Sequence, residues 1–171
     1  AVDAPAVPGY TPNVAHVDRV ENPTADTKLA NVVINYTADD QSQVVNYVDP
    51  NGKVIKSDTI TGKTTQTVNV TPSVPDHYEL VPGQDIPENV TLKTDNPVIN
   101  IQVTPKMDPV TDPAKLNKSI SRTITINKPG EKQQVINQTA TFERTGQHNE
   151  VTGEDVYTGW TLKDNTLEAV D

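Results

Sequence analysis

The chain contains no cysteine, which excludes disulfide bonds, thioester bonds and catalysis by a thiol nucleophile. Its stability must therefore come from packing and hydrogen bonding alone. Aromatic residues are also scarce, at 4% of the 171 residues with one Phe and one Trp, and hydrophobic residues make up 33%. A single large core would be thin with so little apolar material, so we expect two small units in a row rather than one globule.

Positive charge is in short supply as well. The chain has 14 Lys and Arg residues against 23 Asp and Glu residues, which gives a formal net charge of −9. This balance argues against nucleic acids and anionic membrane surfaces as partners. The sequence also shows no signal peptide, no apolar run of membrane-spanning length and no sorting motif. We interpret the chain as a fragment of a larger protein or as a soluble protein.

Signatures of catalysis and metal binding are missing. No Ser-His-Asp order with a nucleophile elbow, no phosphate-binding glycine loop and no paired-carboxylate signature stands out. The three histidines, His16, His77 and His148, lie far apart, and none has a partner at metal-ligand spacing. The pair Asp39-Asp40 and the other acidic turns lack the alternating oxygen ligands of a calcium loop. We therefore expect a chain that is not an enzyme, without cofactors, and calcium at the acidic turns is the alternative that stays open.

Valine and threonine are abundant, and both favour the pleated, half-buried surface of a β-sheet. No window shows a sustained apolar stripe with helical spacing, so helices should be few and short. Residues 29–37 (LANVVINYT) and 97–104 are predicted strands, and Asp49-Pro50-Asn51-Gly52 is a predicted turn. Further strands are predicted at residues 44–48, 53–60, 64–70, 78–81, 89–93, 119–127, 134–144 and 155–161.

Two stretches of the chain resemble known domains. The order Tyr47-Val48-Asp49 with Gly52, then Thr61-Gly62, then Tyr78-Glu79-Leu80-Val81 resembles the MucBP module, over roughly residues 44–105. MucBP modules are ubiquitin-like β-grasp domains of surface adhesins from lactobacilli and related Gram-positive bacteria. Farther along, the order RTITI, QTATFERTG, EVTGED and YTGW resembles the second domain of mucus-binding protein repeats, which is also β-grasp-like.

The resemblance implies a mainly β chain, an elongated tandem of small ubiquitin-like β-grasp modules with little helix. We expect a MucBP-like module at 41–105, a linker at 106–118 and a second module of the mucus-binding repeat at 119–171. The linker is expected because Met107-Asp108-Pro109 and Asp112-Pro113 favour turns.

The amino-terminal residues 1–40 raise a question of repeat phase. In tandem repeats of this family, a segment like Gly9-Tyr10-Thr11-Pro12 normally follows the Trp-containing hairpin, but here it lies at the amino end. Ala-Val-Asp also occurs at both ends of the chain. We therefore expect that residues 1–40 complete the second domain of a preceding repeat, which leaves 119–171 incomplete. One hypothesis is head-to-tail contact between copies through 1–37 and 119–171. The alternative is that residues 1–37 fold against the MucBP-like module of their own chain.

The resemblance also implies a function. The chain is expected to be a repeat unit of an extracellular, cell-wall-anchored adhesin that binds host mucin glycoproteins and, as in some members, immunoglobulins. The alternative is a stalk repeat that binds nothing.

Mucins are usually polyanionic, so the net charge of −9 opposes long-range attraction, and affinity must come from hydrogen bonds and ring stacking. The ligand-binding candidates are Tyr47, Tyr78 and Tyr157, whereas Trp160 and Phe142 are expected in the core.

Overall fold

The computed structural model describes residues 1–170. The chain divides into two compact units, residues 1–104 and 105–171. Sixteen strands and one four-residue helix are assigned within the described residues, so the prediction of a mainly β chain with little helix is confirmed. None of the helices found in the described part is long and apolar enough to cross a membrane.

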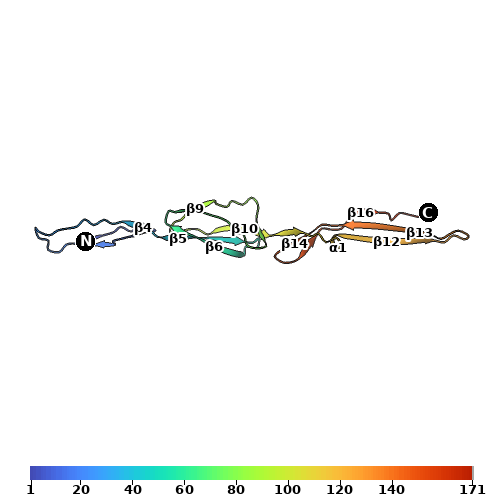
Figure 1. Cartoon of the computed structure of the whole chain (residues 1–171), viewed down its shortest axis with the longest axis horizontal. Helices are drawn as coiled ribbons and strands as arrows, with labels where there is room; N and C mark the ends of the chain where they lie inside the picture. The colour runs from blue at the N-terminus through green and yellow to red at the C-terminus, as the bar shows by residue number, and fades with distance from the viewer. Residues whose placement is uncertain (171) are drawn as a thin grey trace. The chain divides into compact units, whose positions relative to one another are not determined.

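The first unit is built around a four-stranded sheet in the order β6-β5-β10-β8. Strand β5 (Asp40–Val48) forms an antiparallel hairpin with β6 (Val54–Lys63), and β10 (Ile99–Pro105) lies parallel to β5 on its other side. Strand β8 (Tyr78–Leu80) completes the sheet. Figure 1 labels the three longer strands of this sheet, β5, β6 and β10. This mixed order, in which the last long strand lies parallel to the first at the centre, is that of a β-grasp sheet.

The hairpin turn forms as its sequence predicts. Oδ1 of Asp49 accepts hydrogen bonds from the backbone N–H groups of Asn51 and Lys53, each at 2.9 Å. Gly52 has φ of +83°, a left-handed conformation that glycine adopts at little cost. The side-chain bonds of Asp49 and the glycine together reverse the chain between β5 and β6.

The core of this unit lies on one face of the sheet. Successive residues of a strand face opposite sides, so Val45 and Tyr47 of β5 point inward together with Ile101 and Val103 of β10, and all four are buried. The segment after β6 covers this face without a helix. The hydroxyl of Tyr47 accepts a hydrogen bond from the backbone N–H of Ser73, which holds the covering loop against the core.

The rest of the first unit consists of short ladders. Strand β7 (Thr67–Asn69) pairs with β9 (Asn89–Thr91). In the amino-terminal segment, β1 (Val2–Asp3) pairs with β3 (His16–Val17), and β2 (Tyr10–Pro12) pairs with β4 (Tyr36–Ala38).

Residues 9–12 contact the MucBP-like part of their own chain. The carbonyl of Gly9 accepts hydrogen bonds from Oγ1 of Thr64 at 2.7 Å and from the backbone N–H of Asp39 at 2.9 Å. A Cβ atom at Gly9 would lie 2.6 Å from that same Oγ1, so only glycine allows so close an approach. By contrast, residues 29–35 form no ladder, although the sequence predicts a strand over 29–37. The prediction of a strand is wrong for residues 29–35, and the observed strand is β4 alone.

The second unit contains two antiparallel three-stranded sheets in the orders β11-β14-β15 and β12-β13-β16. The strands of the first sheet are β11 (Met107–Pro109), β14 (Gly146–Asn149) and β15 (Asp155–Tyr157). Those of the second sheet are β12 (Asn117–Ile126), β13 (Gln134–Glu143) and β16 (Thr161–Asn165). The strand predicted at 155–161 is therefore interrupted at 158–160.

The residues expected to form a linker, 106–118, are hydrogen-bonded into the second unit. Strand β11 pairs with β14, and α1 (Pro113–Leu116) follows it. Oδ1 of Asp112 accepts a hydrogen bond from the backbone N–H of Ala114 at 3.0 Å, which caps the helix, and Pro113 occupies its first turn. An Asp-Pro pair can begin a helix as well as a turn. The prediction of a linker considered only the turn.

Replacing a central core residue should destabilise the first unit. We expect Ile101→Ala to lower the free energy of unfolding by about 2–5 kcal/mol, because it removes buried methyl groups and leaves a cavity. The exposed Val98 of the same segment provides the control, and Val98→Ala should change stability by less than about 0.5 kcal/mol. Urea unfolding followed by circular dichroism would measure both. Equal effects of the two variants would contradict the assignment of Ile101 to the core.

Candidate functional site

The three tyrosines predicted to bind a ligand lie in different surroundings. Tyr47 is 1% exposed and forms part of the first core, so it presents no ring face to a ligand, and its prediction as a stacking residue is wrong. Tyr78 is half-buried and packs against that same core. Tyr157 lies at the end of β15 in the second unit and joins a cluster of polar and aromatic side chains.

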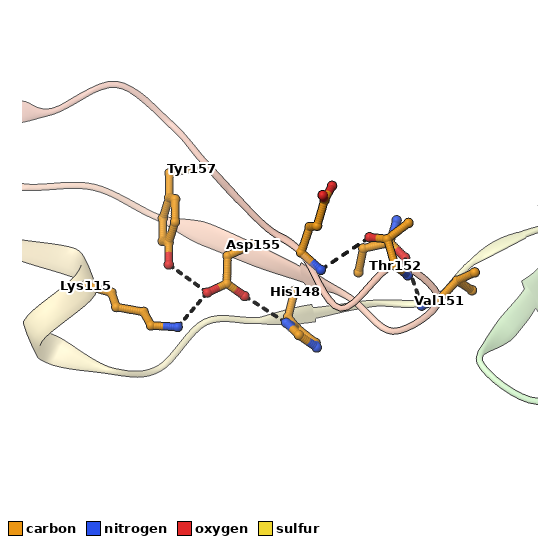
Figure 2. A network of polar contacts seen from close by, with 8 residues as sticks. Lys115, His148, Val151, Thr152, Asp155 and Tyr157 are labelled. Carbon is orange, nitrogen blue, oxygen red and sulfur yellow. Dashed lines mark hydrogen bonds and ion pairs between the residues drawn. The ribbon is translucent and has the colours of Figure 1, made fainter.

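The centre of this cluster is the carboxylate of Asp155, the first residue of β15. Nζ of Lys115 lies 2.7 Å from Oδ2, the hydroxyl of Tyr157 donates to Oδ2 at 2.8 Å, and Nδ1 of His148 lies 2.8 Å from Oδ1. Figure 2 shows the three side chains converging on one carboxylate. The contacts join α1, β14 and β15, so a single acidic side chain links three elements of the unit.

The charges in this cluster stabilise one another. The hydrogen bond from Lys115 and those involving His148 and Tyr157 lower the pKa of Asp155 well below its usual range. The same ion pair raises the pKa of Lys115, first through the hydrogen bond and then through the charge of Asp155. Desolvation, followed by the bond to Asp155, raises the pKa of Tyr157. The carboxylate thus stays charged and the phenol neutral near pH 7, which suits positioning of the ring rather than proton transfer.

Tyr157 in turn positions Arg144. The central carbon of the Arg144 guanidinium lies 3.8 Å from the ring centroid of Tyr157 and 4.4 Å from that of Trp160, distances at which a cation is attracted to a ring face. Nε of Arg144 donates to the carbonyl of Lys115 at 2.8 Å. Within the described residues, the Nη groups of Arg144 donate no hydrogen bond to the protein.

A hollow opens beside this stack. It is lined by residues 116–117, 143–145 and 158–161, which supply the Trp160 ring, the Arg144 side chain, and amide and hydroxyl groups. Trp160 is 40% exposed, so the expectation that it is a core residue is wrong. Its ring and a planar cation beside it are suited to a flat, polar ligand such as a sugar with an acidic substituent.

The first unit also has a polar hollow, between the ends of β5 and β6 and residues 94–96. None of its lining residues is aromatic, so it offers hydrogen bonds without a stacking surface. Among residues 1–170, no group of three His, Asp or Glu side chains is placed to hold a metal ion. The hollow beside Trp160 is therefore the stronger candidate.

Sequence reasoning identified Tyr157 but missed Arg144. The signal was present, because Arg144 lies in the TFERTG motif, directly before the Thr145-Gly146 pair at the start of β14. An arginine just beyond the end of a strand, in a chain with few cations and few aromatic rings, is a reasonable partner for the aromatic residues that follow.

Each of the two units contains a region that matches a known family model. Residues 44–102 match the family model of the MucBP domain, and residues 111–171 match that of the Muc B2-like domain. Both resemblances found in the sequence are thereby confirmed. The candidate hollow lies wholly within the Muc B2-like match. No curated protein matches the chain.

Two solved structures align with this chain. The structure described as the crystal structure of Mub-RV has 24% sequence identity and a TM-score of 0.48, and the alignment covers 73% of this chain and 74% of that chain. A type 2 repeat of the mucus binding protein MUB from Lactobacillus reuteri has 20% identity and a TM-score of 0.41, over 70% of this chain and 74% of that one.

Removing the Asp155 charge should destabilise the protein in a pH-dependent way. The pKa of Asp155 is lowered in the folded state, so its contribution is present in full above the unfolded pKa, about 4. That contribution is lost as the pH falls through the folded value. Asp155→Asn should therefore have a lower urea midpoint than the wild type at pH 7, and the difference should shrink below pH 4.

Trp160 fluorescence would follow the unfolding of this unit, because Trp160 is the chain's one tryptophan. Asp164→Asn, at an exposed position of β16, is the control and should leave the midpoint unchanged at both pH values. A difference between Asp155→Asn and wild type that persists unchanged at pH 3 would contradict the role of the charge.

Proposed function

The chain combines a MucBP domain with a Muc B2-like domain, and from this premise we propose that it is a repeat unit of a bacterial cell-surface adhesin that binds mucin glycoproteins. Both families consist of adhesin repeats rather than enzymes. The proposal includes an extracellular location on a protein anchored to the cell wall. Immunoglobulins are a second proposed partner, on the ground of the sequence resemblance alone.

The observation that carries the proposal is the exposed Trp160 ring beside Arg144. A sugar presents one flat apolar face and a rim of hydroxyl groups, so it can stack on Trp160 while its rim meets the polar groups of the hollow. The planar guanidinium of Arg144 is suited to a carboxylate or a sulfate, because its N–H groups match two acidic oxygens at once. Mucin glycans that carry sialic acid or sulfate have these features.

Charge does not prevent such binding at short range. The net charge of −9 repels an anionic ligand over long distances, but salt screens charges beyond about 8 Å at physiological ionic strength. At the hollow, the acidic Glu143 lies 3.2 Å from Nζ of Lys163, which offsets its charge. The ligand therefore meets Arg144 as the dominant local cation.

Each contact of this kind is weak, and copies in series would multiply it. Linking several sites raises the effective concentration of each site without any new contact, so avidity can exceed single-site affinity by orders of magnitude. A repeat with one shallow, solvent-exposed hollow suits that mode of binding. The alternative function is a stalk repeat, which spaces a distal domain from the wall and binds nothing itself.

Substitutions in the hollow test the proposal. We expect Trp160→Ala to weaken binding to immobilised mucin at least about tenfold, because an exposed aromatic anchor is lost. Trp160→Tyr should retain part of the affinity. Arg144→Gln should weaken binding to native mucin but not to mucin treated with sialidase and sulfatase. Val151→Ala, in the turn between β14 and β15, is the matched control and should bind as the wild type does. Surface plasmon resonance would measure all four variants.

Three results would contradict the proposal in different ways. If the wild type does not bind mucin before or after enzyme treatment, the stalk function is favoured. If the wild type binds and Trp160→Ala binds equally well, the ligand uses another surface, and Tyr78→Ala would then test the half-buried tyrosine of the first unit. Binding to immunoglobulin alone would replace the glycan with a protein partner.

A further inference from the structure

The β12–β13 hairpin has two chemically different faces. Residues paired across an antiparallel ladder point to the same side, and the register pairs Ile120 with Ala140 and Ile124 with Ile136. This side is largely apolar. The alternate positions of β12 on the opposite side carry Ser and Thr, namely Ser119, Ser121, Thr123 and Thr125. The hairpin is thus amphipathic, as a sheet with one covered face would be.

Part of the apolar side is nevertheless exposed, although Ala140 is buried and Ile124, Ile136 and Phe142 are half-buried. Ile120 is 46% exposed, and Leu162 of the neighbouring β16 is also exposed. An apolar hollow lined by Lys118, Ile120, Phe142 and Trp160 opens on this side. The exposed area indicates that the sheet lacks apolar material that would complete it.

Strand β12 also has a free edge. It pairs with β13 on one side and is the outer strand of its sheet, and eight of its ten residues are exposed. An edge strand of this length offers a row of backbone N–H and C=O groups to an added strand. The outer strand β6 of the first unit is equally long, but its Lys56 and Lys63 are paired with Asp58 and Asp40. Strand β12 carries Lys118 and Arg122 and no acidic residue, so its edge is positively charged.

Residues 29–35 have the properties of a strand without a ladder. The run contains Leu29, Val32, Val33 and Ile34, which favour strands, and the first three of these are more than half exposed. No β-ladder includes these residues. Their backbone hydrogen bonds within the described chain are with Asn13, which contacts Val33 and Asn35. Residues 29–35 are therefore apolar, favour an extended conformation and have backbone groups that a neighbouring strand can pair with.

Residues 29–35 carry no charged side chain, but the parts of the chain around the two segments have opposite charge. Residues 1–40 carry six acidic and two basic side chains, a net charge of −4, whereas residues 117–143 carry four basic and two acidic side chains, a net charge of +2. In a chain whose total is −9, the hairpin is the locally positive part. The acidic part of one copy is therefore attracted to the hairpin of another copy. This attraction favours contact between the two different surfaces over contact between like surfaces.

We propose that residues 29–35 of one copy add as a strand to the free edge of β12 in a second copy. Val32 and Ile34 would then extend the apolar side of that sheet next to Ile120. Because the donor and acceptor surfaces differ, the contact is head-to-tail, and repeated use of it builds open chains of molecules. This proposal does not depend on mucin binding, because its partner is a second copy of the chain and its main contact is the backbone edge of β12. The two proposed surfaces meet at Trp160, which lines both hollows.

The full-length chain tests the proposal by sedimentation over a range of concentrations. The wild type should increase in mass with concentration beyond the dimer. Val33→Pro removes a backbone N–H from the donor, and Ile120→Asp places a charge on the acceptor edge, which opposes strand addition. Each variant alone should remain a monomer. Val135→Asp, at an equally exposed position on the opposite side of the hairpin (53% for Val135), should associate as the wild type does.

Mixing the two defective variants gives the decisive result. Ile120→Asp keeps an intact donor and Val33→Pro keeps an intact acceptor, so an equimolar mixture should form a dimer and stop there. Lys118→Glu provides a second acceptor variant if Ile120→Asp disturbs the hairpin by circular dichroism. A wild type that is monomeric up to several hundred micromolar would overturn the proposal. So would a mixture that stays monomeric, or self-association that Val33→Pro leaves unchanged.

Discussion

The parallel ladder between β5 and β10 joins the beginning and the end of the region that matches the MucBP model, and it holds the first unit together. The register sets Ile101 beside Tyr47, and both side chains enter the same core. With no disulfide available and hydrophobic residues at 33%, few other contacts can close this fold. The covering loop depends on the ladder too, because the Tyr47 hydroxyl that holds Ser73 is placed by the strand pairing.

The second unit also has few buried apolar side chains, but it is stabilised in a different way. Its long hairpin buries little, and polar contacts take over where apolar contacts are few. The Asp155 carboxylate gathers a lysine, a histidine and a tyrosine from three elements, and the tyrosine ring then supports Arg144. The arrangement leaves Trp160 partly exposed. The contacts that stabilise the unit therefore also form the proposed binding hollow.

Alternation of apolar and polar residues predicted β5, β6, β10, β12 and β13, because a half-buried strand must alternate. The alternation did not show that Tyr47 faces the core. The side of β5 that is buried is set by its pairing with β10, which lies far along the chain. The alternation at 29–37 looked equally good, yet a ladder forms only at β4, because a strand needs a partner that the local pattern cannot supply. Arg144 was missed for a similar reason, since its aromatic neighbours follow it by 13 and 16 positions.

The parallel β5–β10 ladder has a mechanical consequence. When force is applied through the chain at residues 40 and 105, it pulls two parallel neighbours in opposite directions along their length. All the hydrogen bonds between them are then loaded in shear at once, rather than peeled apart one after another as in a hairpin pulled at its open end. Extension of the chain through these two points is therefore opposed by the whole ladder at once, in a sequence that contains no cysteine and so has no disulfide crosslink.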